Sequence, residues 1–74
     1  MTISSYENRP DERLIRIGEV KRLTGLSTAT LYRKIAANDF PRPVALGALA
    51  RAWPLSEVQD WIAARVAVRG GSNV

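Results

Sequence analysis

The chain has 74 residues, contains no cysteine and no histidine, and carries a formal net charge of +4. This length allows one domain without a cleft between lobes. The missing residue types remove the commonest general base, the usual zinc ligands and any disulfide, which argues against an enzyme, a metal site and a bound cofactor. Apolar runs fall far short of the roughly 20 residues of a membrane span, and no secretory signal opens the chain, so we expect a cytoplasmic protein.

The two ends of the chain differ from its middle. Residues 1–12 are polar, lack apolar periodicity and contain Pro10, which predicts a flexible N-terminal arm. Residues 70–74 are predicted to form a disordered tail. Residues 13–69 form the predicted folded domain and hold ten basic and four acidic side chains, which leaves a charge of +6. A surface of this charge attracts polyanions, although it also serves simply to keep a small domain in solution.

The first half of the domain has the pattern of two short helices. After an extended segment at residues 14–17, a helix is predicted from Gly18 to Gly25, where glycine favours a C-terminal cap. Ser27 is a suitable N-cap for a second helix over residues 28–37. Two helices joined by a three-residue turn that contains glycine are typical of a helix-turn-helix.

The second half predicts a hairpin and one more helix. Two prolines keep residues 40–43 out of a helix, and residues 44–46 and 51–53 then read as strands on either side of a short loop. Ser56 and Gln59 have the spacing of a capping box, which predicts a third helix over residues 57–68. The expected core side chains are Val20, Leu23, Leu26, Leu31, Ile35, Phe40, Trp53, Val58, Trp61, Ile62 and Val66.

This order of elements predicts a mainly α fold with a small β-hairpin, which is a winged helix-turn-helix DNA-binding domain. On the second helix, Leu31 and Ile35 face the core, so Tyr32 and Arg33 face outward between small residues that allow DNA to approach. An arginine there can pair with the O6 and N7 atoms of guanine. The structural alternative makes Tyr32 a packing residue and Arg33 a solvated charge.

Other candidate contacts surround this face. Hydroxyl groups cluster at the start of the helix, where free backbone N–H groups and the helix dipole favour a phosphate. A lysine one step round the helix can reach a flanking phosphate, and two arginines bracket the hairpin, where a basic wing touches the backbone or the minor groove. The residues predicted to bind DNA are Ser27, Thr28, Thr30, Tyr32, Arg33, Lys34, Arg42 and Arg51.

The stretch from Leu14 to about Arg65 resembles the AlpA family of small phage and prophage regulators, which is related to excisionases and to MerR-type winged helix-turn-helix proteins. The likeness is carried by the segments LIRIGEV, LTGLSTATLYRKI and DFPRPVALG, and by a tryptophan followed by SEVQDWIAAR. It implies a DNA-binding transcriptional regulator, often of an excision or integrase gene. The recognition positions that it implies are Ser27, Thr28, Thr30, Tyr32 and Arg33.

The sequence departs from this family in the hairpin. Ala45, Leu49 and Ala52 stand where the family often has basic residues, and Arg51 would project from the other face of the strand than a basic residue at position 52. The departures concern the contact between wing and DNA rather than the recognition helix.

We therefore expect a sequence-specific DNA-binding transcriptional regulator of a prophage or integrative element, with helix 28–37 in the major groove and the protein nucleoid-associated when bound. One alternative is an excisionase, or recombination directionality factor, that bends DNA and contacts an integrase. Another is a protein-interaction module or inhibitor that does not bind DNA. Expected partners are double-stranded DNA and further copies of the chain as a dimer or side by side, with integrase and RNA polymerase as further candidates and no membrane.

Overall fold

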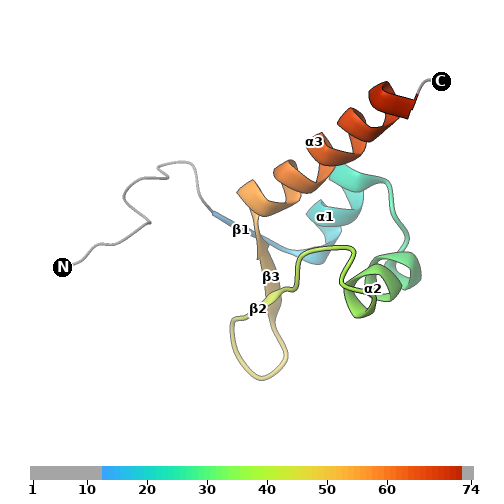
Figure 1. Ribbon diagram of the computed structural model, residues 1–74. Coiled ribbons are helices and arrows are strands. Elements are labelled where there is room, and N and C mark those ends of the chain that lie inside the picture. The colour runs from blue at the N-terminus through green and yellow to red at the C-terminus, as the bar shows by residue number, and fades with distance from the viewer. Residues whose placement is uncertain (1–12, 73–74) are drawn as a thin grey trace.

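The computed structural model describes residues 13–72, with the side chains of residues 13–69. It contains β1 (Leu14–Ile15), α1 (Ile17–Thr24), α2 (Thr28–Ala36), β2 (Val44–Ala45), β3 (Arg51–Pro54) and α3 (Leu55–Ser72), as Figure 1 shows. The predicted mainly α winged helix-turn-helix is confirmed. None of the helices in residues 13–72 is both long enough and apolar enough to cross a membrane. The predicted arm and the last two residues of the predicted tail lie outside the described residues.

The turn between α1 and α2 is built by two local caps. Gly25 has φ 77°, a left-handed conformation that glycine adopts without strain, and its N–H donates to the carbonyl oxygen of Lys21 at 2.7 Å. Ser27 caps α2 because its Oγ accepts the N–H of Thr30 at 3.2 Å. At the other end of α2, Asn38 has φ 62°, a conformation that asparagine tolerates. Both predicted caps of the turn are confirmed.

The predicted hairpin is part of a sheet with three strands in the order β1-β3-β2. All pairs are antiparallel, with Ile15 opposite Trp53 and Val44 opposite Ala52. The hairpin is closed by the N–H of Leu46, which donates to the carbonyl oxygen of Ala50 at 2.7 Å. The sequence predicted an extended segment before α1 but not its pairing with β3, which makes β3 the central strand.

The core lies between the sheet and the helices. Trp53 is fully buried, and its indole N–H donates to the carbonyl oxygen of Pro41 at 2.9 Å. The prediction is wrong for two residues assigned to the core, because Leu23 is 41% exposed and Val66 is 50% exposed. The first lies near the C-terminal end of α1, and the second lies in the second half of α3. This half of the helix extends away from the rest of the fold (Figure 1). The buried core consists of Ile15, Val20, Leu31, Phe40, Trp53 and Val58, with Ile17, Leu26, Ile35, Leu55, Trp61 and Ile62 packed against it.

The third helix is longer than predicted at both ends. It begins at Leu55, whose N–H donates to the carbonyl oxygen of Arg13 at 2.7 Å, so Ser56 lies inside the first turn rather than before the helix as predicted. The first N–H group of α3 is therefore satisfied by a backbone carbonyl group of the residue that precedes β1. The helix continues to Ser72, past the predicted end at Val68 and into the predicted tail.

Candidate nucleic-acid interface

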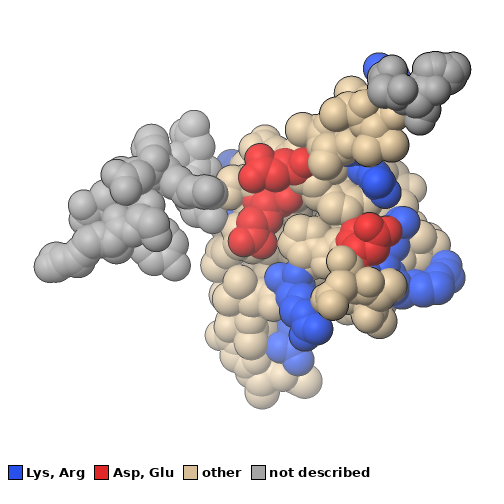
Figure 2. All heavy atoms as spheres, viewed as in Figure 1, with Lys and Arg blue, Asp and Glu red and all other residues tan. Residues whose placement is uncertain are grey.

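The helix α2 and the hairpin project from the same side of the molecule. In Figure 1, α2 and the loop between β2 and β3 lie below the body of the fold, and α3 crosses the opposite side. We call residues 46–50, which join the two strands, the wing. In the same view, basic side chains spread over the lower and right-hand surface, whereas acidic ones gather mainly near the start of α3 (Figure 2). The side that carries α2 and the wing is therefore the side on which a polyanion is favoured.

The outer face of α2 has the orientation predicted from its helical spacing. Leu31 is fully buried and Ile35 is partly buried and packed against the core, which anchors the back of the helix. Tyr32 is 43% exposed and Arg33 is exposed. The small residues next to them on the wheel, Ala29 and Ala36, are exposed as well. The helix thus presents an arginine and a tyrosine on a face where its backbone can approach a ligand closely.

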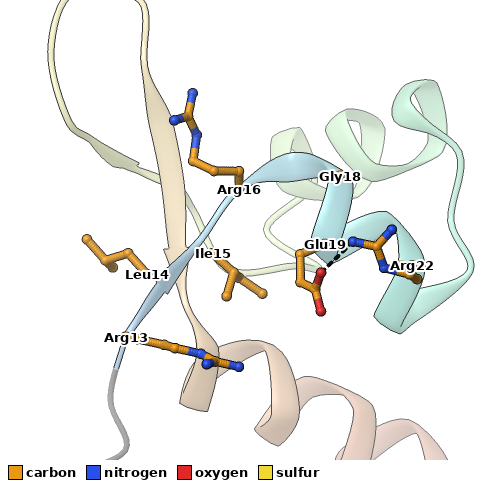
Figure 3. A pocket seen from close by; sticks show the side chains of 7 residues that line it. All are labelled: Arg13, Leu14, Ile15, Arg16, Gly18, Glu19 and Arg22. Atoms are coloured by element: carbon orange, nitrogen blue, oxygen red, sulfur yellow. Dashed lines mark hydrogen bonds and ion pairs between the residues drawn. The ribbon is translucent and has the colours of Figure 1, made fainter.

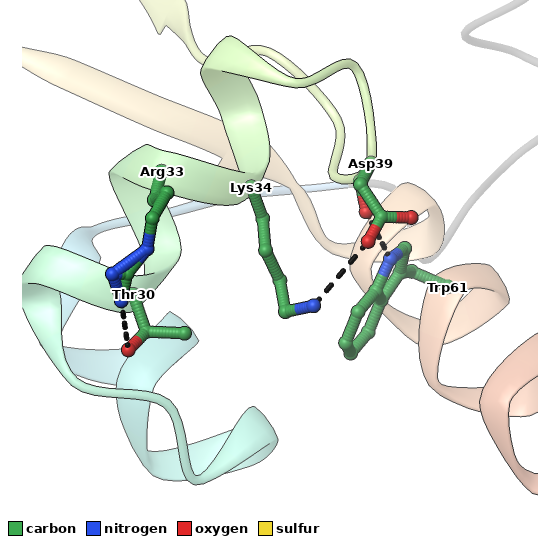
Figure 4. Close-up of polar contacts among 5 residues, drawn as sticks. All are labelled: Thr30, Arg33, Lys34, Asp39 and Trp61. Carbon is green, nitrogen blue, oxygen red and sulfur yellow. Dashed lines mark hydrogen bonds and ion pairs between the residues drawn. The ribbon is translucent and has the colours of Figure 1, made fainter.

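A short chain of hydrogen bonds holds the polar end of this face. The hydroxyl of Ser27 donates to Thr30 Oγ1 at 3.0 Å. Arg33 Nη2 donates to the same oxygen at 3.1 Å, as Figure 4 shows. Both acceptor positions of the Thr30 hydroxyl are used, which leaves its O–H as a donor. Thr30 therefore also positions Arg33, a structural role that the sequence did not reveal. Thr28, the other threonine of this first turn, is exposed.

Lys34 is held by an acidic neighbour rather than left free for a ligand. Its ammonium lies 3.3 Å from Asp39 Oδ2, and the two side chains are 30% and 49% exposed. The backbone of Asp39 is itself fixed, because its carbonyl oxygen accepts the indole N–H of Trp61 at 2.7 Å (Figure 4). Trp61 packs edge-on against Phe40, with ring centroids 4.9 Å apart. The predicted role of Lys34 thus requires this ion pair to open.

Arginines flank the hairpin, and its tip is uncharged. Arg42 and Arg51 are both exposed, and Arg51 pairs with Ala45 across the hairpin. The next residue, Ala52, is fully buried, which confirms that positions 51 and 52 point to opposite faces of β3. The wing consists of Leu46, Gly47, Ala48, Leu49 and Ala50, so charge is present at the base of the hairpin and absent from its tip.

Sequence reasoning missed one basic residue that points toward this side. Arg13 and Arg16 leave β1 in different directions, Arg13 toward α3 and Arg16 toward the hairpin (Figure 3). The carbonyl of Arg16 accepts the N–H groups of Glu19 and Val20, so the residue is fixed at the N-cap of α1 while its side chain is exposed. Nothing in the local sequence marks it, because its direction follows from the pairing of β1 with β3.

Two of the other charges beside β1, Glu19 and Arg22, compensate each other. An open pocket of about 520 Å³ is lined by Arg13, Arg16, Glu19 and Arg22 among others (Figure 3). The hydrogen bond and charge of Arg22 hold the pKa of Glu19 below its usual value, and Glu19 raises the pKa of Arg22. These two side chains form an ion pair. Among residues 13–72, no group of three or more His, Cys, Asp or Glu side chains is placed to hold a metal ion.

Comparison with known proteins assigns the fold to a family. Residues 13–66 match the family model described as prophage CP4-57 regulatory protein (AlpA). The chain belongs to the AlpA family. An uncharacterized protein, ORF88 of Enterobacteria phage P4, is similar, with 47% identity over 58 residues. That alignment covers 78% of this chain and 66% of the phage protein, so the chain spans just under two thirds of this relative.

The AlpA match contains the whole arrangement described above. It extends from the residue before β1 to the middle of α3, and therefore includes both helices of the helix-turn-helix, the sheet and the wing. All eight residues predicted to bind DNA and the additional Arg16 fall within it. The last part of α3, residues 67–72, lies beyond the AlpA match.

Proposed function

We propose that this AlpA-family protein is a sequence-specific DNA-binding transcriptional regulator of a prophage or integrative element, acting on the nucleoid in the bacterial cytoplasm. The observation that carries the proposal is the exposed face of α2, where Tyr32 and Arg33 stand outward from a helix anchored in the core by Leu31. The description of the family as a prophage regulatory protein supports the regulatory part.

In the proposed complex, α2 lies in the major groove and the surrounding groups hold the phosphates. Arg33 pairs with a guanine edge, and Tyr32 contacts the neighbouring base or sugar. The free N–H groups at the start of α2, together with the hydroxyls of Thr28 and Thr30, bind one phosphate, and the Ser27 hydroxyl joins them by giving up its bond to Thr30 Oγ1. Phosphate contacts from other parts of the fold fix the position of the protein along the duplex without reading the DNA sequence. These additional phosphate contacts come from Arg16, Arg42 and Arg51.

A single copy reads only a short site. Nine residues of α2 make a helix about 14 Å long, which covers roughly four base pairs of a groove whose rise is about 3.4 Å per base pair. Useful specificity therefore requires two or more copies, and we propose that they bind as a dimer or side by side on half-sites about 10 base pairs apart. Integrase or RNA polymerase would then be recruited to this assembly.

Selection from a library of random DNA duplexes tests the proposal directly. We expect an enriched motif, and binding to that motif should weaken with salt with a log–log slope near −0.9 for each neutralised phosphate. Fluorescence anisotropy at several salt concentrations measures the slope. If no duplex binds at about 50 mM salt, the proposal is wrong and the alternative of a protein-interaction module is favoured.

Replacing Asp39 by asparagine should strengthen DNA binding. The change removes the partner of Lys34 and frees its ammonium for a phosphate, while the backbone carbonyl that Trp61 contacts is kept. Because an exposed ion pair contributes about 0.2–1 kcal/mol, we expect roughly 1.5- to 5-fold higher affinity for any duplex, and a salt slope steeper by about 0.9. Anisotropy titrations with the selected and a scrambled duplex measure both quantities.

The matched control is the replacement of Asp60 by asparagine. Asp60 is exposed on α3 and its removal changes the net charge by the same amount. The Asp60 variant should leave the salt slope unchanged and should raise the affinity less than the Asp39 variant does. Equal effects of the two variants would show that net charge alone is responsible and that Lys34 gains no phosphate contact.

A further inference from the structure

The wing ends in an apolar side chain that the fold does not use. Leu49 is 96% exposed, the highest value among the large apolar side chains of residues 13–69. Its neighbours Gly47, Ala48 and Ala50 are small, so nothing at the tip shields it. The hydrogen bond from Leu46 N–H to Ala50 closes the loop at 2.7 Å and holds the tip in a narrow hairpin. The wing is therefore a thin projection, and Leu49 is the more exposed of its two leucines.

The surroundings of this group point to a polyanion as its partner. Arg42 and Arg51 are exposed at the base of the hairpin, and Arg16 points toward it (Figure 3). The wing also lies on the same side of the molecule as α2 (Figure 1). With α2 in the major groove, a projection beside it reaches the adjacent minor groove. Charges at its base can hold the phosphates there, and the uncharged tip is thin enough to pass between them.

We propose that Leu49 is an apolar wedge that enters the minor groove, inserts between two base pairs and bends the duplex. This inference rests on the proposed DNA binding and adds DNA bending to it. Apolar side chains inserted in this way unstack a base step and kink DNA by about 20–90° toward the major groove. Pyrimidine–purine steps such as TA and CA unstack most easily, so the wing selects a flexible step at a position where it forms no hydrogen bonds with bases.

The test measures binding and bending separately on the same duplex. The probe is the duplex obtained by selection, with a fluorescent dye at each end and, in a second version, 2-aminopurine at the step beneath the wing. Energy transfer between the dyes reports the bend, 2-aminopurine emission reports unstacking, and anisotropy reports affinity. The variants are Leu49→Ala and, as a control, Val66→Ala, which removes a half-exposed apolar side chain from α3.

The natural protein should raise both the energy transfer and the 2-aminopurine emission. Leu49→Ala should abolish both signals while changing the affinity by less than about tenfold, because the lost contact and the avoided cost of unstacking offset each other. Val66→Ala should behave like the natural protein. Retained bending with Leu49→Ala, or a bound but straight duplex with the natural protein, would overturn the inference.

Two further outcomes are distinct from these. Reduced cooperativity between copies with unchanged bending would show that Leu49 docks on a second protein molecule, which also overturns the wedge. Absence of binding to any duplex would refute the proposed function itself, and the wedge with it. Binding without bending refutes the wedge alone.

Discussion

Replacement of Trp53 by alanine is expected to lower the free energy of unfolding by about 3–5 kcal/mol. A domain of this size is stabilised by only about 3–10 kcal/mol, so the variant should lose a large share of its stability. The reason is the position of the indole, which is fully buried on the central strand opposite Ile15. Its removal leaves a cavity and deprives the carbonyl oxygen of Pro41 of its donor.

Urea unfolding followed by circular dichroism measures this loss. Leu49→Ala is the control, because that side chain is 96% exposed and its truncation should change stability by less than about 0.5 kcal/mol. Trp53→Phe keeps most of the ring but lacks the N–H donor, and should fall between the two. A Trp53→Ala variant as stable as the control would contradict the placement of the core around β3.

The second large effect concerns the reading of DNA. Replacement of Arg33 by alanine should reduce the preference for the selected site over a scrambled duplex by about 5- to 150-fold, which corresponds to the 1–3 kcal/mol of one bidentate arginine–guanine contact. The structure supports this choice because Arg33 is exposed on α2 and is oriented by the Thr30 hydroxyl at 3.1 Å. Competition binding between the two duplexes measures the ratio of affinities.

A control variant that loses the same charge distinguishes recognition of the DNA sequence from general electrostatic attraction to DNA. Arg69 is exposed near the end of α3, outside the residues that match the family. Its replacement by alanine should weaken binding to both duplexes slightly and equally. If Arg33→Ala behaves in this way too, the outer face of α2 is not the surface that reads the sequence.

Features fixed by neighbouring residues could be predicted from the sequence. The left-handed cap at Gly25 and the N-cap at Ser27 depend on a few adjacent positions, so the helix-turn-helix was predicted with its ends nearly correct. Helical spacing also predicted that Tyr32 and Arg33 point away from Leu31. This spacing needs no knowledge of what covers the helix, because it only separates the apolar face from the polar one.

Features that depend on distant segments could not be predicted. The pairing of β1 with β3 and the bond from Leu55 to the carbonyl of Arg13 join segments about forty residues apart, and so the third strand and the true start of α3 were missed. Helical spacing places Leu23 on the apolar face of α1, but Leu23 is exposed. The spacing of residues along one helix cannot show how far the neighbouring elements extend over that face. The ion pair of Lys34 with Asp39 likewise depends on how the chain turns after α2.

The direct join between β3 and α3 fixes the direction in which the long helix leaves the hairpin. β3 ends at Pro54 and α3 begins at Leu55, so no connecting residue absorbs a change in angle. An 18-residue helix is about 27 Å long, and a rotation of about 10° at this corner therefore carries its far end through about 5 Å. The angle of the chain at Pro54 and Leu55 thus decides where the far end of α3 lies relative to the hairpin.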